Sequence, residues 1–157
     1  VYAMTGASRA HNLIALNVAS ELRTRLRGRP CEVYAHDMRV RVRGDRRRPD
    51  RYVYPDVVAL CGEPQMEDAE GDTLLNPTLI VEVLSPSTEA YDRGGKFVGY
   101  RRLASLQEFV LVAQDAVRVE HYARQGDGWL LTELADLDAE LALPALGVRV
   151  PLRDVYD

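Results

Sequence analysis

The sequence predicts an α/β fold in which a mixed central β-sheet is flanked by helices and extended by a β-hairpin. Three observations predict it. A stretch near the start has the apolar periodicity of a helix. Two apolar runs, Leu79–Leu84 and Glu108–Ala113, have the length and β-branched content of buried strands, with helix-compatible sequence between them. Two alternating segments near the end flank a Gly-rich turn. A strand, helix, strand unit crosses over to a parallel strand, so we expect one mixed sheet with a helix on each side.

Length and composition set the class of protein. The 157 residues fit a single domain, 1–157, with a sizeable core, and 46% hydrophobic with 28% charged residues is ordinary for a globular protein. No apolar run has the length of a transmembrane span, so no membrane partner is expected. Cys31 and Cys61 lie in or beside strand-like runs without metal-ligand spacing, which favours buried free thiols. We therefore expect a reducing, cytoplasmic setting. Because the first residue is Val1, we expect the native start to be missing.

The charge is unevenly distributed along the chain. The total is −4, which does not indicate a nucleic-acid binder, but residues 1–53 carry a net +7 and residues 54–157 a net −11. Such asymmetry can create a local basic face in an acidic protein.

The first predicted element is an amphipathic helix from Ala7 to about Arg27. Ser8 is a candidate N-cap, and Gly28 with Pro30 ends the helix. His11, near the start, is interpreted as a capping or packing histidine rather than a ligand. The apolar face consists of Leu13, Ile14, Leu16, Val18, Leu22 and Leu26.

A half-buried strand is predicted next, over Glu32–Arg43, because apolar and polar residues alternate there. Its Asp37 is expected to face solvent, the alternative being that it joins the same centre as Asp56. The following loop, Gly44–Arg51, has three consecutive arginines that form either a solvated turn, which is favoured, or phosphate contacts. Residues Gly62–Asn76 are acidic and lack periodicity, so a loop is expected.

Two strand-like runs each carry one acid. Asp56 lies in Tyr54–Cys61, and Glu82 lies in Leu79–Leu84. An ionised group in a buried strand is costly unless a metal, a cation or hydrogen bonds compensate it. Lone carboxylates in two neighbouring strands indicate a shared divalent cation, and such oxygen ligands suit Mg²⁺ or Mn²⁺. The alternative is that backbone donors at the strand ends satisfy each acid.

The helix predicted from about Glu89 to Leu103 has a polar face. Asp92, Lys96 and Tyr100 recur at intervals of four and share it. Lys96 is the sole lysine among 20 basic residues, and a lysine supplies a compact ammonium with a tunable pKa that arginine cannot. The alternative for Asp92 and Lys96 is an ion pair on an exposed helix face.

The last third of the chain is predicted to be mostly β-structure. Val117–Ala123 and Trp129–Leu134 flank the turn Gln125–Gly128 and form a hairpin. Gly147–Pro151 is a short edge strand, which Pro151 ends.

Several segments together resemble the Uma-two family of endonucleases, which belongs to the PD-(D/E)xK nuclease superfamily with its restriction-endonuclease-like core. The resemblance runs from about Tyr2 to Tyr156. EVLSPST followed by D-x-x-x-K-x-x-x-Y is its most specific part. The segments are YAMTGAS with His11, YPDVVALC, LIVEVLSPST, DRGGKFVGY and LQEFVLVAQD.

The superfamily motif maps onto this sequence with one departure. Pro55-Asp56 matches its P-D, and Glu82 matches its acid. The motif lysine should follow two residues later, but that residue is Leu84. The resemblance implies that Lys96 supplies the ammonium instead. Glu82 lies about 10 Å back along its strand and Lys96 about 12 Å along the returning helix, so the two can meet at one level.

The resemblance implies a metal-dependent endonuclease-like phosphodiester hydrolase acting on DNA. We expect Asp56, Glu82 and the Val83 carbonyl to hold Mg²⁺ or Mn²⁺. Lys96, positioned by Tyr100 and Asp92, would orient or deprotonate water or stabilise charge on the phosphate. A homodimer is expected because two strand cuts are often made by two copies. The alternatives are hydrolysis of RNA or a small phosphodiester, and a catalytically inactive nucleic-acid-binding or oligomerisation module, which Leu84 and the acidic total favour.

Overall fold

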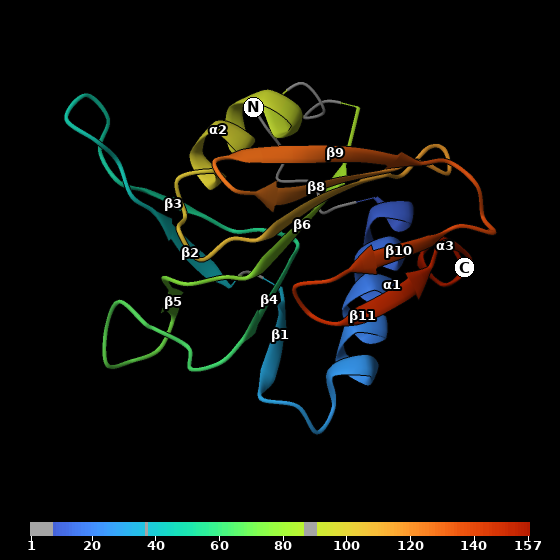
Figure 1. Ribbon diagram of the computed structural model, residues 1–157, viewed down its shortest axis with the longest axis horizontal. Coiled ribbons are helices and arrows are strands. Elements are labelled where there is room, and N and C mark those ends of the chain that lie inside the picture. Colours follow the sequence, from blue (N-terminus) through green and yellow to red (C-terminus); the bar gives the residue numbers. More distant parts are fainter. Residues whose placement is uncertain (1–7, 37, 87–90) are drawn as a thin grey trace.

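The computed structural model describes residues 8–36, 38–86 and 91–157, and its centre is a six-stranded mixed sheet (Figure 1). The strand order is β1-β4-β6-β7-β8-β9. Only β6 and β7 pair in parallel, and the other neighbours are antiparallel. The mixed sheet is therefore confirmed. Its strands are β1 (Cys31–Ala35), β4 (Val57–Cys61), β6 (Leu79–Leu84), β7 (Glu108–Ala113), β8 (Val119–Gln125) and β9 (Gly128–Leu134).

Two hydrophobic clusters cover the two faces of this sheet. Successive side chains of a strand point to opposite faces. Accordingly Val81 and Val83 of β6 pack with α1 (Arg9–Leu26), whereas Ile80 and Leu84 pack with α2 (Phe97–Tyr100). Every residue of β6 and β7 is buried, as expected for central strands with both faces covered.

The first helix forms as the sequence predicts. The Ser8 hydroxyl accepts a hydrogen bond from the His11 backbone N–H, so Ser8 is the N-cap. Ile14, Val18, Leu22 and Leu26 form the buried stripe. The helix ends before Gly28, whose φ of 77° is in the left-handed region that favours glycine.

The single strand predicted over Glu32–Arg43 is wrong. The chain turns at His36, whose φ is 59°. The second half, β2 (Arg39–Val42), leaves the main sheet and pairs with β3 (Arg51–Val53) and β5 (Thr73–Leu74). Alternation continues on both sides of the turn, so the pattern alone does not reveal the break. Asp37 lies outside the described residues.

The helix after β6 also differs from its prediction. Tyr91–Lys96 is a π-helical turn, and only Phe97–Tyr100 is α-helical. Two consecutive glycines, Gly94 and Gly95, give this segment a low intrinsic helix propensity. The expected helix start at Glu89, the N-terminal residues 1–7 and the side chain of Asp92 lie outside the described part of the structure.

The predicted hairpin is confirmed as β8 and β9, which pair antiparallel. A second hairpin was only half predicted: the short strand expected at Gly147–Pro151 is its second strand, but the first strand was not predicted. It consists of β10 (Glu140–Leu143) and β11 (Val148–Pro151), and α3 (Leu152–Val155) follows it. These elements pack against α1 on the same face of the main sheet (Figure 1).

The expectation of free thiols is wrong. Cys31 and Cys61 are directly opposite each other in β1 and β4, and a disulfide joins them. Their separation of 30 residues in sequence gave no sign that strand pairing would bring them together. A cytoplasmic location stays a prediction. Among the helices of the described residues, none has the length and hydropathy needed to cross a bilayer.

Candidate functional site

Asp56 and Glu82 come from neighbouring strands at the centre of the main sheet. Val57 of β4 is opposite Val81 of β6, so extending this antiparallel register by one residue sets Asp56 opposite Glu82. Opposite residues of an antiparallel pair point to the same face. The Val83 backbone N–H donates a hydrogen bond of 2.8 Å to Oδ2 of Asp56. This bond ties the acid that precedes β4 to the strand that carries Glu82.

Glu82 is a buried carboxylate with a nearby cation. Its residue is only 3% exposed. Lys96 Nζ lies 3.3 Å from Oε2, and the Tyr100 hydroxyl donates to Oε1 at 3.0 Å. Burying a charge is costly unless it is paired and hydrogen-bonded. Lys96 and Tyr100 supply that compensation from the π-turn and α2, because residues four apart share a face.

Asp56 is more accessible and meets a residue from α1. Its side chain is 21% exposed, and its Oδ1 lies 3.2 Å from Nε2 of His11. Sequence reasoning favoured a capping or packing role for His11 and so missed this contact. The backbone N–H of His11 is indeed capped by Ser8, but the ring is directed at Asp56. The one signal in the sequence for this contact was that His11 lies beside the YAMTGAS segment.

Ser8 and Gln114 hold the end of β6 next to these groups. Gln114 Nε2 donates to the Leu84 carbonyl at 2.8 Å, and the Ser8 hydroxyl donates to Gln114 Oε1 at 2.6 Å. The start of α1 is thereby fixed to the end of β6. His11 therefore contacts Asp56 close to the place where these hydrogen bonds join α1 to β6.

The donor atoms fit a hard divalent cation. Asp56 and Glu82 supply carboxylate oxygens, and the Val83 carbonyl follows directly on the same strand, which is the oxygen chemistry that Mg²⁺ and Mn²⁺ prefer. The partial exposure of Asp56 leaves a route from solvent.

Comparison with known proteins gives the family. The family model Uma2, described as "Putative restriction endonuclease", matches residues 1–153. The chain belongs to the Uma2 family. Two relatives from Synechocystis are uncharacterized proteins. The protein sll1609 is 39% identical over 88% of this chain and 76% of its own, and slr1290 is 34% identical over 99% and 79%.

The fold is also that of a solved structure. The chain matches the crystal structure of a "putative nuclease belonging to DUF820" from Anabaena variabilis with a TM-score of 0.77. The match covers 97% of this chain and 83% of the other at 15% identity. At that identity the likeness shows the shared fold alone.

Leu84, which stands in the motif lysine position of this Uma2 chain, is part of the core. It is 3% exposed and belongs to the same hydrophobic cluster as Tyr100 and Leu111. Glu82 and Leu84 are two residues apart on one strand and so share a face. The ammonium near Glu82 comes from Lys96 instead.

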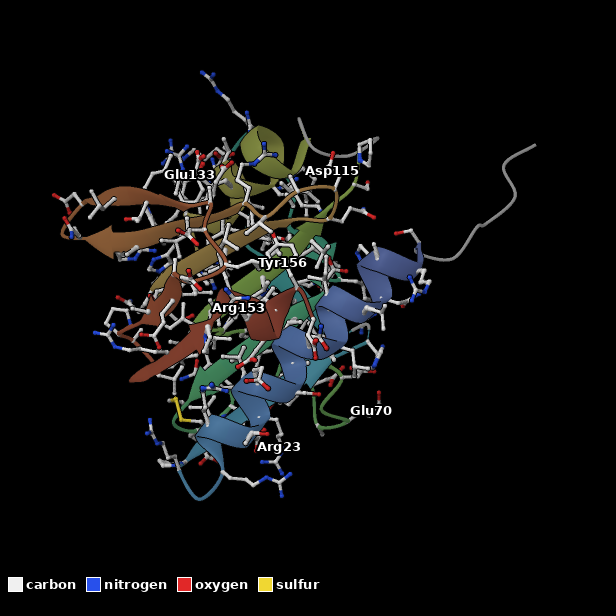
Figure 2. The ribbon with its side chains drawn as sticks, turned by 90° about the vertical axis from the view of Figure 1, so that its right-hand side faces the viewer. Arg23, Glu70, Asp115, Glu133, Arg153 and Tyr156 are labelled. Atoms are coloured by element: carbon white, nitrogen blue, oxygen red, sulfur yellow. A yellow bond between two sulfur atoms is a disulfide. The ribbon has the colours of Figure 1, made fainter. Side chains whose placement is uncertain are left out.

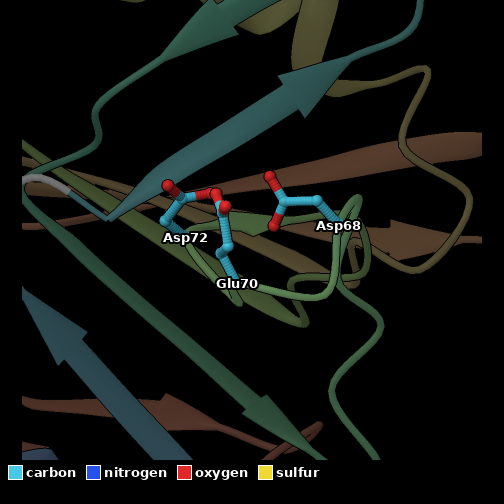
Figure 3. A group of neighbouring side chains, drawn as sticks. All are labelled: Asp68, Glu70 and Asp72. Atoms are coloured by element: carbon cyan, nitrogen blue, oxygen red, sulfur yellow. The ribbon is translucent and has the colours of Figure 1, made fainter.

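A second acidic group lies in the connection that precedes β5 (Figure 3). Asp68, Glu70 and Asp72 have carboxylate oxygens within 4.8 Å of one another, and all three residues are exposed. Arg39 of β2 lies 3.4 Å from Asp72. Exposed acidic groups of this kind are common without an ion.

Three arginines of the basic first third, Arg25, Arg39 and Arg41, are paired with acids. Arg41 lies 3.1 Å from Glu67 in the acidic connection. Arg102, just after α2, lies 2.6 Å from Asp45 in the loop that carries three consecutive arginines. The Asp45 carboxylate accepts a hydrogen bond from the Arg47 backbone N–H. This bond and, to a lesser extent, the Arg102 guanidinium lower the pKa of the Asp45 carboxyl. Acids of the later part of the chain therefore neutralise Arg39 and Arg41, whereas Arg102 adds positive charge beside Asp45.

Proposed function

We propose that this Uma2 protein is a metal-dependent endonuclease that hydrolyses phosphodiester bonds in DNA, with Asp56, Glu82 and Lys96 at its reaction centre. The observation that carries the proposal is the 3.3 Å separation between the ammonium of the sole lysine and the buried Glu82 carboxylate. Family membership supports nuclease chemistry.

Asp56, Glu82 and the Val83 carbonyl would hold Mg²⁺ or Mn²⁺. When bound, such a cation supplies Lewis acidity toward the scissile phosphate and lowers the pKa of water. Two neighbouring carboxylates repel each other unless a cation lies nearby. The burial of Glu82 increases the cost of leaving this negative charge without a cation.

Lys96 acts on the reacting atoms. Its side chain is 23% exposed, so the ammonium can contact Glu82 and a substrate from the solvent side. There it orients the attacking water, or donates a hydrogen bond to the phosphate oxygen that gains charge in the transition state. Tyr100 and His11 are positioning residues, because they hold Glu82 and Asp56 respectively.

The rival function is a catalytically inactive nucleic-acid-binding or oligomerisation module. Leu84 in the motif lysine position favours it. Lys96 argues against the inactive module, because it brings an ammonium to Glu82 from the π-helical turn. A surface ion pair needs no buried carboxylate, whereas Glu82 is 3% exposed and bonded to Tyr100 as well. This expensive arrangement favours the hydrolase.

Cleavage of supercoiled plasmid DNA tests the function. The protein with Mg²⁺ or Mn²⁺ should relax and linearise the plasmid, and chelation should stop it. Lys96→Met should lower the rate at least about a hundredfold, since removal of one transition-state donor typically costs that much. Full activity of Lys96→Met would remove Lys96 from the mechanism.

Metal binding is tested separately by thermal unfolding. Mn²⁺ should raise the melting temperature of the wild type and of Lys96→Met, because a ligand that binds only the folded state stabilises it. Asp56→Asn should lose the shift, whereas the matched control Asp72→Asn, in the exposed acidic group, should keep it. An equal shift in Asp56→Asn would favour the inactive module.

The substrate and assembly follow from the same chemistry. DNA is proposed over RNA because of the family description, and parallel assays with RNA of the same sequence decide between them. We further propose a homodimer, in which each copy cuts one strand. Sedimentation of the protein with a DNA duplex should then give two copies per duplex.

A further inference from the structure

A groove with a volume of about 590 Å³ lies beside α2, between that helix and the β8–β9 hairpin. The lining includes Phe97, Arg101, Arg102, Arg124, Trp129 and Leu131. Phe97 directly follows Lys96 in sequence, so the groove begins one residue from the proposed reaction centre. Figure 1 shows α2 lying near the end of the hairpin at which β8 turns into β9.

The wall of the groove is a cluster of aromatic rings. The Phe97 ring lies 4.4 Å from the Tyr122 ring and 5.3 Å from the Trp129 ring, centroid to centroid. Phe97 also stacks on Phe109 of the core. Trp129 thus packs on a cluster that includes rings from the strands of the sheet. Its own side chain is only partly buried. Phe97 packs edge-on against Trp129, so these rings form a rigid aromatic wall beside the groove.

Arginines make the same groove cationic. Three arginines and one acid, Asp127, are in the lining, and one of these arginines, Arg102, is paired with Asp45. The Arg124 guanidinium lies 4.5 Å from the Trp129 ring and donates to the Leu106 and Leu103 carbonyls at 2.8 and 3.0 Å, which fixes its plane. The Arg101 guanidinium lies 5.3 Å from the Phe97 ring.

Flat aromatic rings next to fixed guanidinium groups match one kind of ligand in particular. Proteins that bind single-stranded nucleic acid stack bases on aromatic and guanidinium planes and hold the phosphates with positive charge. A double helix hides its base faces in the stack, so it cannot use such a surface. The exposed Leu131 widens the apolar floor without adding charge.

We propose that this groove binds an unpaired stretch of DNA, with a base stacked against the Trp129–Arg124 pair and phosphates contacted by Arg101. The inference deepens the proposed function, on which it rests for the strand being the substrate. It names the substrate class: DNA with a single-stranded segment next to the cut, such as a flap, a bubble or a free end.

The fluorescence of Trp129, the sole tryptophan, reports the binding directly. The probe is an oligothymidylate of about 12 nucleotides, within the range that one such surface contacts. It is titrated into the wild-type protein with chelator present, so that no hydrolysis occurs. Saturable quenching that weakens with added salt is expected. Unchanged fluorescence, or equal quenching by a blunt duplex of the same length, would overturn the proposal.

Matched variants separate stacking from charge. With a fluorescein-labelled oligothymidylate followed by anisotropy, Trp129→Leu should raise Kd about tenfold, and Trp129→Phe, which keeps a ring, should change it less than about threefold. Arg101→Gln should raise Kd and reduce its salt dependence. Arg23→Gln is the charge control, because Arg23 projects from α1 on the opposite face of the sheet (Figure 2). Equal affinity of Trp129→Leu and wild type, or an equal loss in Arg23→Gln, would contradict the proposal.

The two proposals fail in different ways. Quenching without plasmid cleavage would retain the groove and remove the nuclease. Cleavage of duplex DNA without quenching would retain the nuclease and remove the groove. If both hold, Trp129→Leu should slow cleavage of a flap substrate more than that of a blunt duplex, at unchanged melting temperature.

Discussion

Glu82 is both a buried charge that the fold must compensate and the central acid of the proposed reaction centre. It is a carboxylate within a fully buried strand, held by a cation and a phenol hydroxyl. Removing one partner of a buried charged group leaves part of its desolvation uncompensated, which costs more than the contact itself contributes. Changes to its partners should therefore affect both folding and activity.

Tyr100→Phe tests this at a single atom. The ring is buried and packs edge-on against Phe109 at 5.3 Å, so phenylalanine keeps the packing and removes only the hydroxyl that donates to Glu82. The free energy of unfolding should fall by about 1.5–3 kcal/mol, the range for hydrogen bonds to charged groups. Urea denaturation at constant m-value measures it. An unchanged midpoint would mean that the hydroxyl does not compensate the carboxylate.

His11→Ala tests the contact with Asp56. The pair is partly exposed, so the free energy of unfolding should change by less than about 1 kcal/mol. Affinity for Mn²⁺ should fall about tenfold, because a residue that orients a metal ligand typically matters that much. Calorimetric titration measures it. His36→Asn is the control, since His36 is exposed and asparagine tolerates its positive φ. Equal affinities in His11→Ala and wild type would exclude a positioning role.

At the scale of elements, α1, β6, β7 and the β8–β9 hairpin could be predicted because each has a clear period and a clear end. The turn at His36 could not, since apolar and polar residues alternate again directly after it, at Val40 and Val42. The contact between His11 and Asp56 depends on how α1 docks against β4, and the disulfide depends on the register of β1 with β4. Docking and register are long-range properties that local patterns do not contain.

The disulfide is expected to be a major stabilising link between β1 and β4. It closes a segment of 30 residues. A loop of that size contributes about 3–4 kcal/mol by constraining the unfolded chain. Reduction should lower the free energy of unfolding by this amount in guanidinium titrations. The double variant Cys31→Ala/Cys61→Ala serves as the control and should respond to no reductant. Equal stability of reduced and oxidised protein would contradict the expectation.

The loop before β3 should respond to acid through Asp45. The Arg47 backbone N–H and the Arg102 side chain lower the pKa of this carboxyl below its ordinary value of 3.8. A lowered folded-state pKa contributes stability that is complete above the ordinary value and is lost as the pH falls through the lowered one. The carboxyl carbon of Asp45, followed by NMR, should therefore titrate below pH 3.8. In Arg102→Gln the midpoint should rise. A wild-type midpoint at or above the ordinary value would contradict the contact.

At the scale of the whole molecule, one face of the sheet carries most of the groups to which our two proposals assign a role. Glu82, Tyr100, Phe97 and Trp129 belong to the α2 side, and α1 with the second hairpin covers the other side and contributes mainly to the core. The candidate acids were predictable from sequence as single carboxylates in apolar strands. The aromatic groove was not, since α2 and β9 are joined only by folding.

The position of the cation tests the central claim most directly. Crystals grown with Mn²⁺ and measured near the manganese absorption edge should show an anomalous peak. This peak should lie about 2.0–2.3 Å from carboxylate oxygens of both Asp56 and Glu82. Lys96 should remain beside it. A peak at Asp68, Glu70 and Asp72 alone, or none in the protein, would contradict the account of this site as a metal-dependent nuclease centre.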